Sequence, residues 1–312
     1  MPYEDLLRFF IPALLAAGGA WTLDRMCAAR GFLPPGFRQP WRRALASALV
    51  TGILWIGVFS ALGNIGLSLE PDLSTLSTPQ LFLLHGLLVA TILLWFLLGF
   101  AVQPQLALPE ELPPDVAALV PPPAPVQIPL GRQFLAQFGF VAPSVPREIG
   151  LGVLLGIGAW VVVLGAIFAF AAAVVALGGE DVLPKQPPAL IPWIAALPVA
   201  VRILISLSAG VVEETFFRGF LQPRIGVPLS TAFFVLAHFS YGQPFMLVGI
   251  TLLSLIYGYL VRWRQNIWPA IAAHTLFDAV QLLVVVPSAL RLIGEEGGKA
   301  TALLGLWLPG IC

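Results

Sequence analysis

Charged side chains are scarce in this 312-residue chain. Asp, Glu, Lys and Arg together make up 10% of the residues, against roughly 25% in a typical soluble domain. The 16 basic and 16 acidic residues balance each other, so net charge gives no indication of a nucleic-acid partner. Hydrophobic residues make up 58%, more than a soluble core of this length can absorb. The composition therefore predicts an all-α, polytopic membrane protein whose surroundings are the lipid bilayer.

Cysteine is also rare. Cys27 and Cys312 are isolated, so they form neither a metal-ligand spacing nor a disulfide framework. Cys312 is the last residue and not the fourth from the end, so it is not a prenylation signal. The N-terminus carries Glu4 and Asp5 in place of the basic start of a signal peptide. We therefore expect the first apolar run to be a structural span.

The uncharged stretches predict about eight membrane spans, because several exceed the roughly 18 apolar residues that indicate one. The expected spans are residues 9–23, 44–69, 80–102, 149–179, 202–220, 227–239, 245–261 and 267–290. Residues 103–147 are rich in proline, which blocks a helix and favours an extended linker. The predicted organisation is a three-span section over 1–102, the linker over 103–147, a helical domain over 148–290 and a tail over 291–312.

Basic residues predict the orientation of these spans. The loop after the first span holds five arginines and one acidic residue, whereas the loop after the second holds Glu70 and Asp72 and no basic residue. Basic loops stay in the cytoplasm. The later odd-numbered loops are basic as well. We expect both termini to lie outside and the protein to reside in the cell membrane.

Ionisable residues occur inside three of the expected spans, where they are costly and usually functional. They are Glu213, Glu214, Arg218, His238, His274 and Asp278. A rise of 1.5 Å per residue places their side chains about 10–17 Å from the cytoplasmic helix ends. Three helices are thus expected to bring polar groups to one layer, inside the bundle and in its cytoplasmic half.

Spacing within each helix predicts which of these side chains meet. Glu214 and Arg218 are four residues apart with the acid first, which favours an ion pair. His274 and Asp278 share one face for the same reason. Glu213 and Glu214 are about 100° apart around a helix, so they have different partners. We expect Glu214 to pair with Arg218 and Glu213 to face a cavity, with the reverse assignment open.

His85 lies in the third span, outside this cluster. A lone histidine on an apolar helix is more often a satisfied structural residue than a ligand. We therefore expect His85 to be a structural contact between helices.

Three motifs carry a specific resemblance. Residues 213–221 read EETFFRGFL, Phe234 and His238 fit F-x-x-x-H, and His274 and Asp278 fit H-x-x-x-N/D. These motifs, in this order and on separate spans, resemble the CPBP family, which contains type II CAAX prenyl endopeptidases and bacterial self-immunity proteins. The resemblance covers roughly residues 148–290.

The resemblance implies an intramembrane endopeptidase that cleaves a peptide bond near the cytoplasmic face. Glu213 would activate water with help from His238. Glu214 and Arg218 would support Glu213 structurally. His274 and Asp278 would hold the substrate carbonyl or a metal. The implied substrate is a membrane protein or a lipidated peptide.

The residues themselves are suited to the same chemistry. Peptide hydrolysis needs an activated water, a proton acceptor and stabilisation of the oxyanion. Two histidines and three carboxylates can fill these roles. The chain has no G-x-S-x-G elbow, and both cysteines lie far from the cluster, so a serine or cysteine nucleophile is disfavoured.

A metal is a further expectation. Family members more often carry asparagine where this chain has Asp278, and an ionised aspartate would repel an oxyanion. Zn²⁺ bound by Glu213, His238, His274 and Asp278 would neutralise the excess negative charge, and this ligand set suits zinc. Proton uptake by one or two of the acids would serve as well, leaving a metal-independent glutamate protease.

Other functions use the same residues. A non-proteolytic member of the family would act as an immunity or assembly factor by binding another membrane protein. Intramembrane acids and histidines also build proton-coupled transporters. A purely structural polar network is the simplest alternative. Clustering in one half of the bilayer and the absence of a visible inverted repeat argue against transport.

Overall fold

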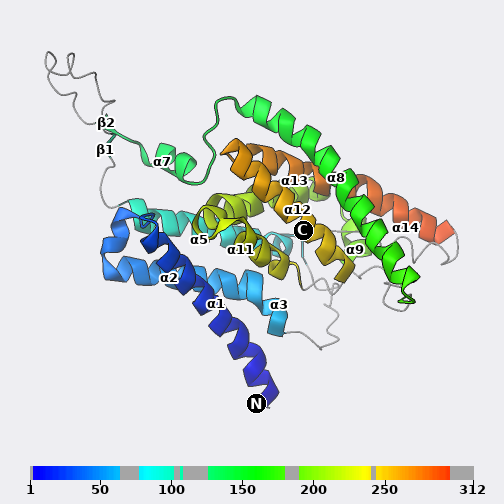
Figure 1. Ribbon diagram of the computed structural model, residues 1–312, viewed down its shortest axis with the longest axis horizontal. Helices are drawn as coiled ribbons and strands as arrows, with labels where there is room; N and C mark the ends of the chain where they lie inside the picture. Colours follow the sequence, from blue (N-terminus) through cyan, green and yellow to red (C-terminus); the bar gives the residue numbers. More distant parts are fainter. Residues whose placement is uncertain are drawn as a thin grey trace.

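The computed structural model describes residues 3–63, 77–101, 106–107, 126–179, 190–239 and 244–295. Within these ranges the chain forms a helical bundle (Figure 1). Its N-terminal helices are α1 (Tyr3–Ala29), η1 (Pro35–Arg38), α2 (Pro40–Leu54), η2 (Trp55–Phe59), α3 (Ser60–Gly63), α4 (Thr78–Leu81) and α5 (Leu83–Phe100). A minimal antiparallel pair, β1 (Leu106–Ala107) and β2 (Val126–Gln127), extends away from the bundle.

The remaining helices contain the predicted site. They are α7 (Leu130–Gln137), α8 (Val145–Ala176), α9 (Leu190–Ala196), α10 (Val199–Ser208), η5 (Ala209–Leu221), α11 (Gln222–Ala237), α12 (Pro244–Arg264), α13 (Trp268–Val280), η7 (Gln281–Val285) and α14 (Val286–Glu295). The long helix α8 runs diagonally across one side of the bundle beside α13.

Six helical stretches among the described residues are long and apolar enough to cross a membrane. They are Leu6–Ala29, Pro40–Gly63, Leu83–Phe100, Val145–Ala176, Met246–Arg264 and Trp268–Arg291. The expectation of an all-α polytopic membrane protein is thus confirmed. The expected spans 202–220 and 227–239 are also helical, but the first carries four charged residues and α11 has only 16 residues. A total of eight spans stays a prediction.

Some helices extend beyond the expected spans. The first helix continues past residue 23 to Ala29, and within this extension Asp24 accepts two hydrogen bonds from Arg43, at 2.8 and 2.6 Å. Part of the expected linker is also helical. Its helix α7 begins directly after Pro129, where the proline-rich segment ends.

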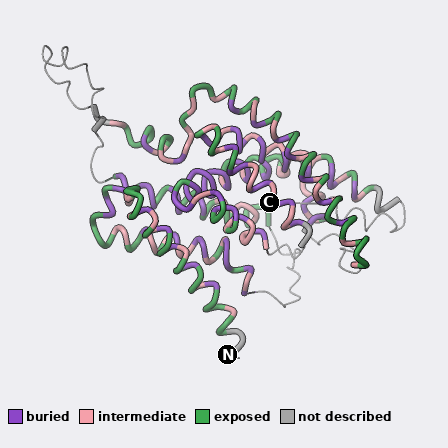
Figure 2. Tube along the Cα trace, in the orientation of Figure 1, coloured by how far each residue is buried: buried purple, intermediate pink, exposed green. Residues whose placement is uncertain are grey.

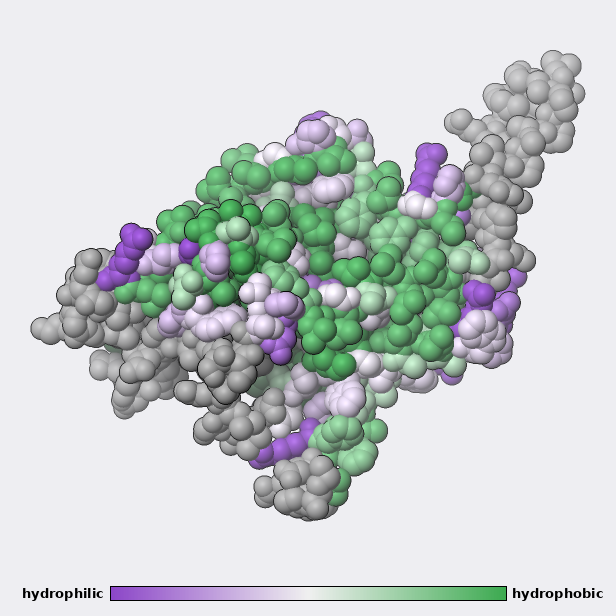
Figure 3. Space-filling view, turned by 180° about the vertical axis from the view of Figure 1, so that it is seen from behind, coloured by the Kyte–Doolittle hydropathy of each residue, from purple (hydrophilic) through white to green (hydrophobic). Residues whose placement is uncertain are grey.

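Apolar side chains cover most of the outer surface, as expected for a protein surrounded by lipid. Leu154 on α8 is 67% exposed and Leu14 on α1 is 69% exposed. Figure 2 shows the exposed residues on the outer helices and the buried residues in the middle of the bundle. In the view from behind, hydrophobic residues dominate the described surface and hydrophilic residues lie mainly towards its edges (Figure 3).

Two glycines of α8, Gly152 and Gly156, let this helix lie directly against α13. A Cβ added to Gly156 would lie 2.9 Å from Cα of Ala273. A Cβ on Gly152 would lie 2.8 Å from Cα of Pro269. Both distances are too short for any side chain, so the two backbones touch directly. This contact fixes the position of α13, in which His274 directly follows Ala273.

Several of the basic loops meet at one end of the bundle. Arg30, after α1, donates to the carbonyl of Arg224 at 3.1 Å. Arg264, at the end of α12, donates twice to Glu148 at the start of α8, at 2.9 and 2.5 Å. The Ile267 amide donates to the Gly139 carbonyl at 2.9 Å. These contacts agree with placing the odd-numbered loops on one side; its assignment to the cytoplasm stays a prediction.

Candidate active site

The first motif lies on an unusually long π-helix. The backbone of η5 follows the π-helical pattern, in which an N–H bonds to a carbonyl five residues earlier, as Gln222 does to Phe217. This pattern rarely exceeds one turn and often marks functional sites. The segment packs closely on both sides. A Cβ on Gly210 would overlap the Thr275 hydroxyl of α13, and one on Gly219 would lie 2.6 Å from the Phe138 carbonyl. The glycine of the F-R-G sequence therefore provides room for the turn after α7.

Glu214 is fully buried at the centre of a polar cluster. One carboxylate oxygen accepts from Nδ1 of His274 at 2.9 Å. The other lies 3.2 Å from Nε of Arg218. The Glu214–Arg218 pair expected from the four-residue spacing is therefore present. Glu214 joins the first motif to the third across the η5–α13 contact.

His274 lies between two carboxylates. Its Nε2 atom is 3.6 Å from an oxygen of Asp278, so both ring nitrogens face negatively charged groups. Only the imidazolium ion has a proton on each nitrogen. A protonated ring together with Arg218 would balance the charges of Glu214 and Asp278. The cluster can thus be neutral with both carboxylates ionised.

Arg218 is held by a second set of contacts. It is 1% exposed, and Nη2 donates to the hydroxyl of Ser254 on α12 at 3.2 Å. Its guanidinium lies 4.3 Å from the ring centre of Phe234, the aromatic residue of the second motif. Cation–π contacts of this kind are favourable when desolvated. All three motifs are therefore connected through Arg218 and Glu214.

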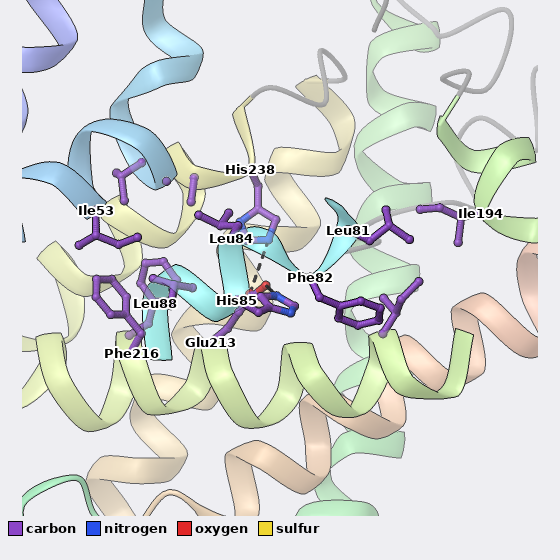
Figure 4. A pocket seen from close by; sticks show the side chains of 15 residues that line it. Ile53, Leu81, Phe82, Leu84, His85, Leu88, Ile194, Glu213, Phe216 and His238 are labelled. Carbon is purple, nitrogen blue, oxygen red and sulfur yellow. Dashed lines mark hydrogen bonds and ion pairs between the residues drawn. The ribbon is translucent and has the colours of Figure 1, made fainter. Parts of the chain in front are cut away.

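Glu213 points in a different direction, towards the other two histidines, His85 and His238 (Figure 4). One carboxylate oxygen is 3.3 Å from Nε2 of His85 on α5. The other is 3.8 Å from Nε2 of His238, which follows the last residue of α11. Nδ1 of His238 donates to the carbonyl of Phe234 at 2.7 Å. A neutral His238 therefore presents the lone pair of Nε2 to Glu213.

Glu213, His85 and His238 line a cavity of about 140 Å³. This volume exceeds what a single water molecule needs by roughly tenfold. Most of its wall is apolar and comes from both halves of the chain. The N-terminal helices contribute Ile53, Val58, Leu81, Phe82, Leu84 and Leu88, and the later helices contribute Ile194, Ile205, Phe216, Phe217 and Ala237. The expectation that Glu213 faces a cavity holds in this arrangement.

The four residues expected to bind zinc fall into two groups. Glu213 and His238 meet at the cavity, whereas His274 and Asp278 lie in the cluster around Glu214. In the described parts of the chain, no three His, Cys, Asp or Glu side chains are arranged to hold a metal ion. The cause is the different directions of Glu213 and Glu214 around η5. The side-chain geometry thus does not support the expected four-ligand site.

For His85 the sequence reasoning was incomplete. His85 is a contact between helices, as expected, but its partners are Ser208 and Glu213, so it also belongs to the site. Its distance along the chain from the three motifs concealed this contact. The available signal was its position as an ionisable residue in an otherwise uncharged span, which indicates function by default. Ser208, which contacts His85 at 2.6 Å, carried no sequence signal.

Comparison with known proteins supports the family resemblance. Residues 195–280 match the family model described as type II CAAX prenyl endopeptidase, Rce1-like. This segment includes all six predicted site residues and excludes His85. The chain is 33% identical over 79 residues to the uncharacterized protein YpbD of Bacillus subtilis (strain 168), covering 25% of this chain and 42% of YpbD. The chain thus spans less than half of that relative's length. No solved structure matches.

Proposed function

Because residues 195–280 match the Rce1-like family of type II CAAX prenyl endopeptidases, we propose that this protein is an intramembrane endopeptidase. Its substrate is a membrane protein or a lipidated peptide. The observation that carries the proposal is the Glu213 carboxylate facing His238 inside an apolar cavity. An apolar wall next to a general base suits a substrate that arrives from the bilayer.

In the proposed reaction, Glu213 and His238 activate water together. The Glu213 oxygen and Nε2 of His238 are 3.8 Å apart, and both are hydrogen-bond acceptors when His238 is neutral. A water molecule placed against both can donate one proton to each, with its lone pair directed at a substrate carbonyl carbon. Glu213 takes the proton as the C–O bond forms and returns it to the leaving nitrogen as the C–N bond breaks.

The cluster around Glu214 supports this step electrostatically. The family resemblance implies that His274 and Asp278 hold the substrate carbonyl. Because neither residue lines the cavity, we propose that His274 acts on the carbonyl through its charge and not by direct contact. The positive charge of the His274 imidazolium then stabilises the negative charge that develops on the carbonyl oxygen. Arg218 and Glu214 fix His274 through the contacts at 2.9 and 3.2 Å. These groups are positioned before the substrate binds, so little reorganisation is needed.

We propose that this mechanism needs no metal, because the predicted zinc ligands lie in two separate groups. Purified protein should therefore keep its cleavage rate after dialysis against a chelator, and elemental analysis should find far less than one zinc per chain. A rate that falls on chelation and returns with added Zn²⁺ would restore the metalloprotease assignment.

The function itself is tested by comparing protein termini in membranes from cells that produce the wild type or Glu213→Gln. Glutamine keeps the size of the side chain and removes the base, so the new termini made by the wild type should disappear. Asp24→Asn is the matched control, because it removes a carboxylate that pairs with Arg43 away from the cavity. This variant should give the wild-type set of termini.

All three proteins must accumulate to equal levels in the membrane before termini are compared. Termini that are the same in the wild type and Glu213→Gln would reject proteolysis at this site. That result would favour the binding factor without proteolytic activity.

A further inference from the structure

His85 enters the cavity from a helix outside the family match. It lies on α5, which has no Asp, Glu, Lys or Arg between Leu83 and Phe100. Its side chain is 13% exposed, and its neighbours on the cavity wall are Leu84 and Leu88. A leucine at this position would suit that wall. The imidazole is thus a polar group in an apolar place and needs partners.

The two ring nitrogens of His85 have different partners, and those partners determine the tautomer. A carboxylate can only accept hydrogen bonds, so Nε2 donates to the Glu213 oxygen 3.3 Å away. In the neutral ring Nδ1 is then an acceptor. The Ser208 hydroxyl, 2.6 Å away, donates to it. Ser208 therefore holds His85 in the form that donates to Glu213.

This hydrogen bond acts on the orientation of Glu213. One carboxylate oxygen is held by His85, and the other faces His238 at 3.8 Å. Rotation of the carboxylate about its terminal torsion, which is broad for glutamate, would break the contact with His85. Figure 4 shows the side chains of His85, Glu213 and His238 directed towards one another from three different helices. The chain Ser208–His85–Glu213 thus directs one oxygen of Glu213 towards His238.

We propose that His85 is a positioning residue that aims the Glu213 carboxylate at the reacting water, with Ser208 fixing its tautomer. This inference rests on the proposed function. It makes the active site dependent on a helix that the family match does not include. The N-terminal section is thereby a working part of the site and not a separate domain.

The test measures kcat and KM on a peptide whose sequence is taken from the Glu213-dependent termini. His85→Leu should lower kcat by roughly 10- to 100-fold, the range expected for a hydrogen bond to a charged group, with little change in KM. His85→Gln should recover most of kcat, since its amide can donate to the same oxygen. Ser208→Ala should lower kcat less than His85→Leu, whereas Ser208→Thr keeps the hydroxyl and should resemble the wild type.

Leu87→Ala is the matched control on the same helix, because Leu87 is 36% exposed and is not part of the cavity wall. It should leave both constants unchanged. Folding of every variant is checked by the protection of Cys27, which is 3% exposed. If His85→Leu alone fails to fold, the positioning role is tested by comparing the kcat values of His85→Gln, Ser208→Ala and Ser208→Thr.

The outcomes separate this inference from the proposed function. Cleavage that needs Glu213 but continues at the wild-type kcat in His85→Leu overturns only the positioning role. A rise in KM with kcat unchanged also overturns it, since His85 would then only shape the cavity. Equal losses of kcat in His85→Leu and His85→Gln also overturn the positioning role. Cleavage that does not depend on Glu213 overturns both proposals.

Discussion

Replacing His238 by asparagine should lower kcat for peptide cleavage by about 10²- to 10⁴-fold, the usual contribution of a positioned acid–base group. Asparagine removes Nε2, which faces Glu213 at 3.8 Å. Its amide can still donate to the Phe234 carbonyl that now accepts from Nδ1. The local structure is thus kept while the acceptor next to the reacting water is lost. Steady-state kinetics on the Glu213-dependent peptide gives the measurement.

His238→Gln separates two explanations of that loss. Glutamine places an amide oxygen near the position of Nε2, so it can accept a hydrogen bond from water but cannot act as a base. A rate close to that of the asparagine variant would mean that proton transfer by His238 matters. A rate close to the wild type would mean that His238 only orients water. Full activity in both variants would contradict the proposed role of His238.

The second large effect concerns stability. Arg218→Met should reduce the free energy of unfolding by about 3–5 kcal/mol, because removing one partner of a buried ion pair leaves the other charge uncompensated. Glu214 is fully buried and 3.2 Å from Arg218, and it cannot reach water. The cation–π contact with Phe234 is lost in the same variant. His274 alone then faces two carboxylates.

Unfolding is followed by the reaction of Cys27 with a thiol probe during heating, in a Cys312→Ser background where Cys27 is the sole thiol. The double variant Arg218→Met with Glu214→Gln removes both charges and should recover much of the lost stability. Arg218→Lys keeps the positive charge but lacks the planar guanidinium group, so its stability should lie between those of the wild type and Arg218→Met. If the double variant were no more stable than Arg218→Met, the uncompensated charge would not be the cause.

Spacing along the helices predicted a large part of the site. The four-residue separations of Glu214 from Arg218 and of His274 from Asp278 depend only on local geometry, and both pairs are present. Glu213 lies beside Glu214, and a helix directs adjacent residues to different sides, so the opposite roles of these acids were predictable too.

Other features depend on contacts that a sequence alone does not specify. His85 meets Glu213 across 128 positions of the chain, and nothing local to either residue indicates that α5 lies against η5. The four expected zinc ligands lie in two groups because their depth, estimated from the sequence, places side chains in one layer without fixing where they point around each helix. Hydrogen bonding in η5 is likewise decided by tertiary packing, since its residues also suit an α-helix.

The π-helix also makes the site sensitive to chain length. Its wider turns hold more residues over the same distance than an α-helix would. Deleting one residue just before Glu213 would turn the following side chains by about 100° relative to the residues before the deletion. Glu214 and Arg218 would stay paired, yet Glu213 would point away from both histidines at the cavity. In this segment an insertion or deletion is therefore a more drastic change than most substitutions.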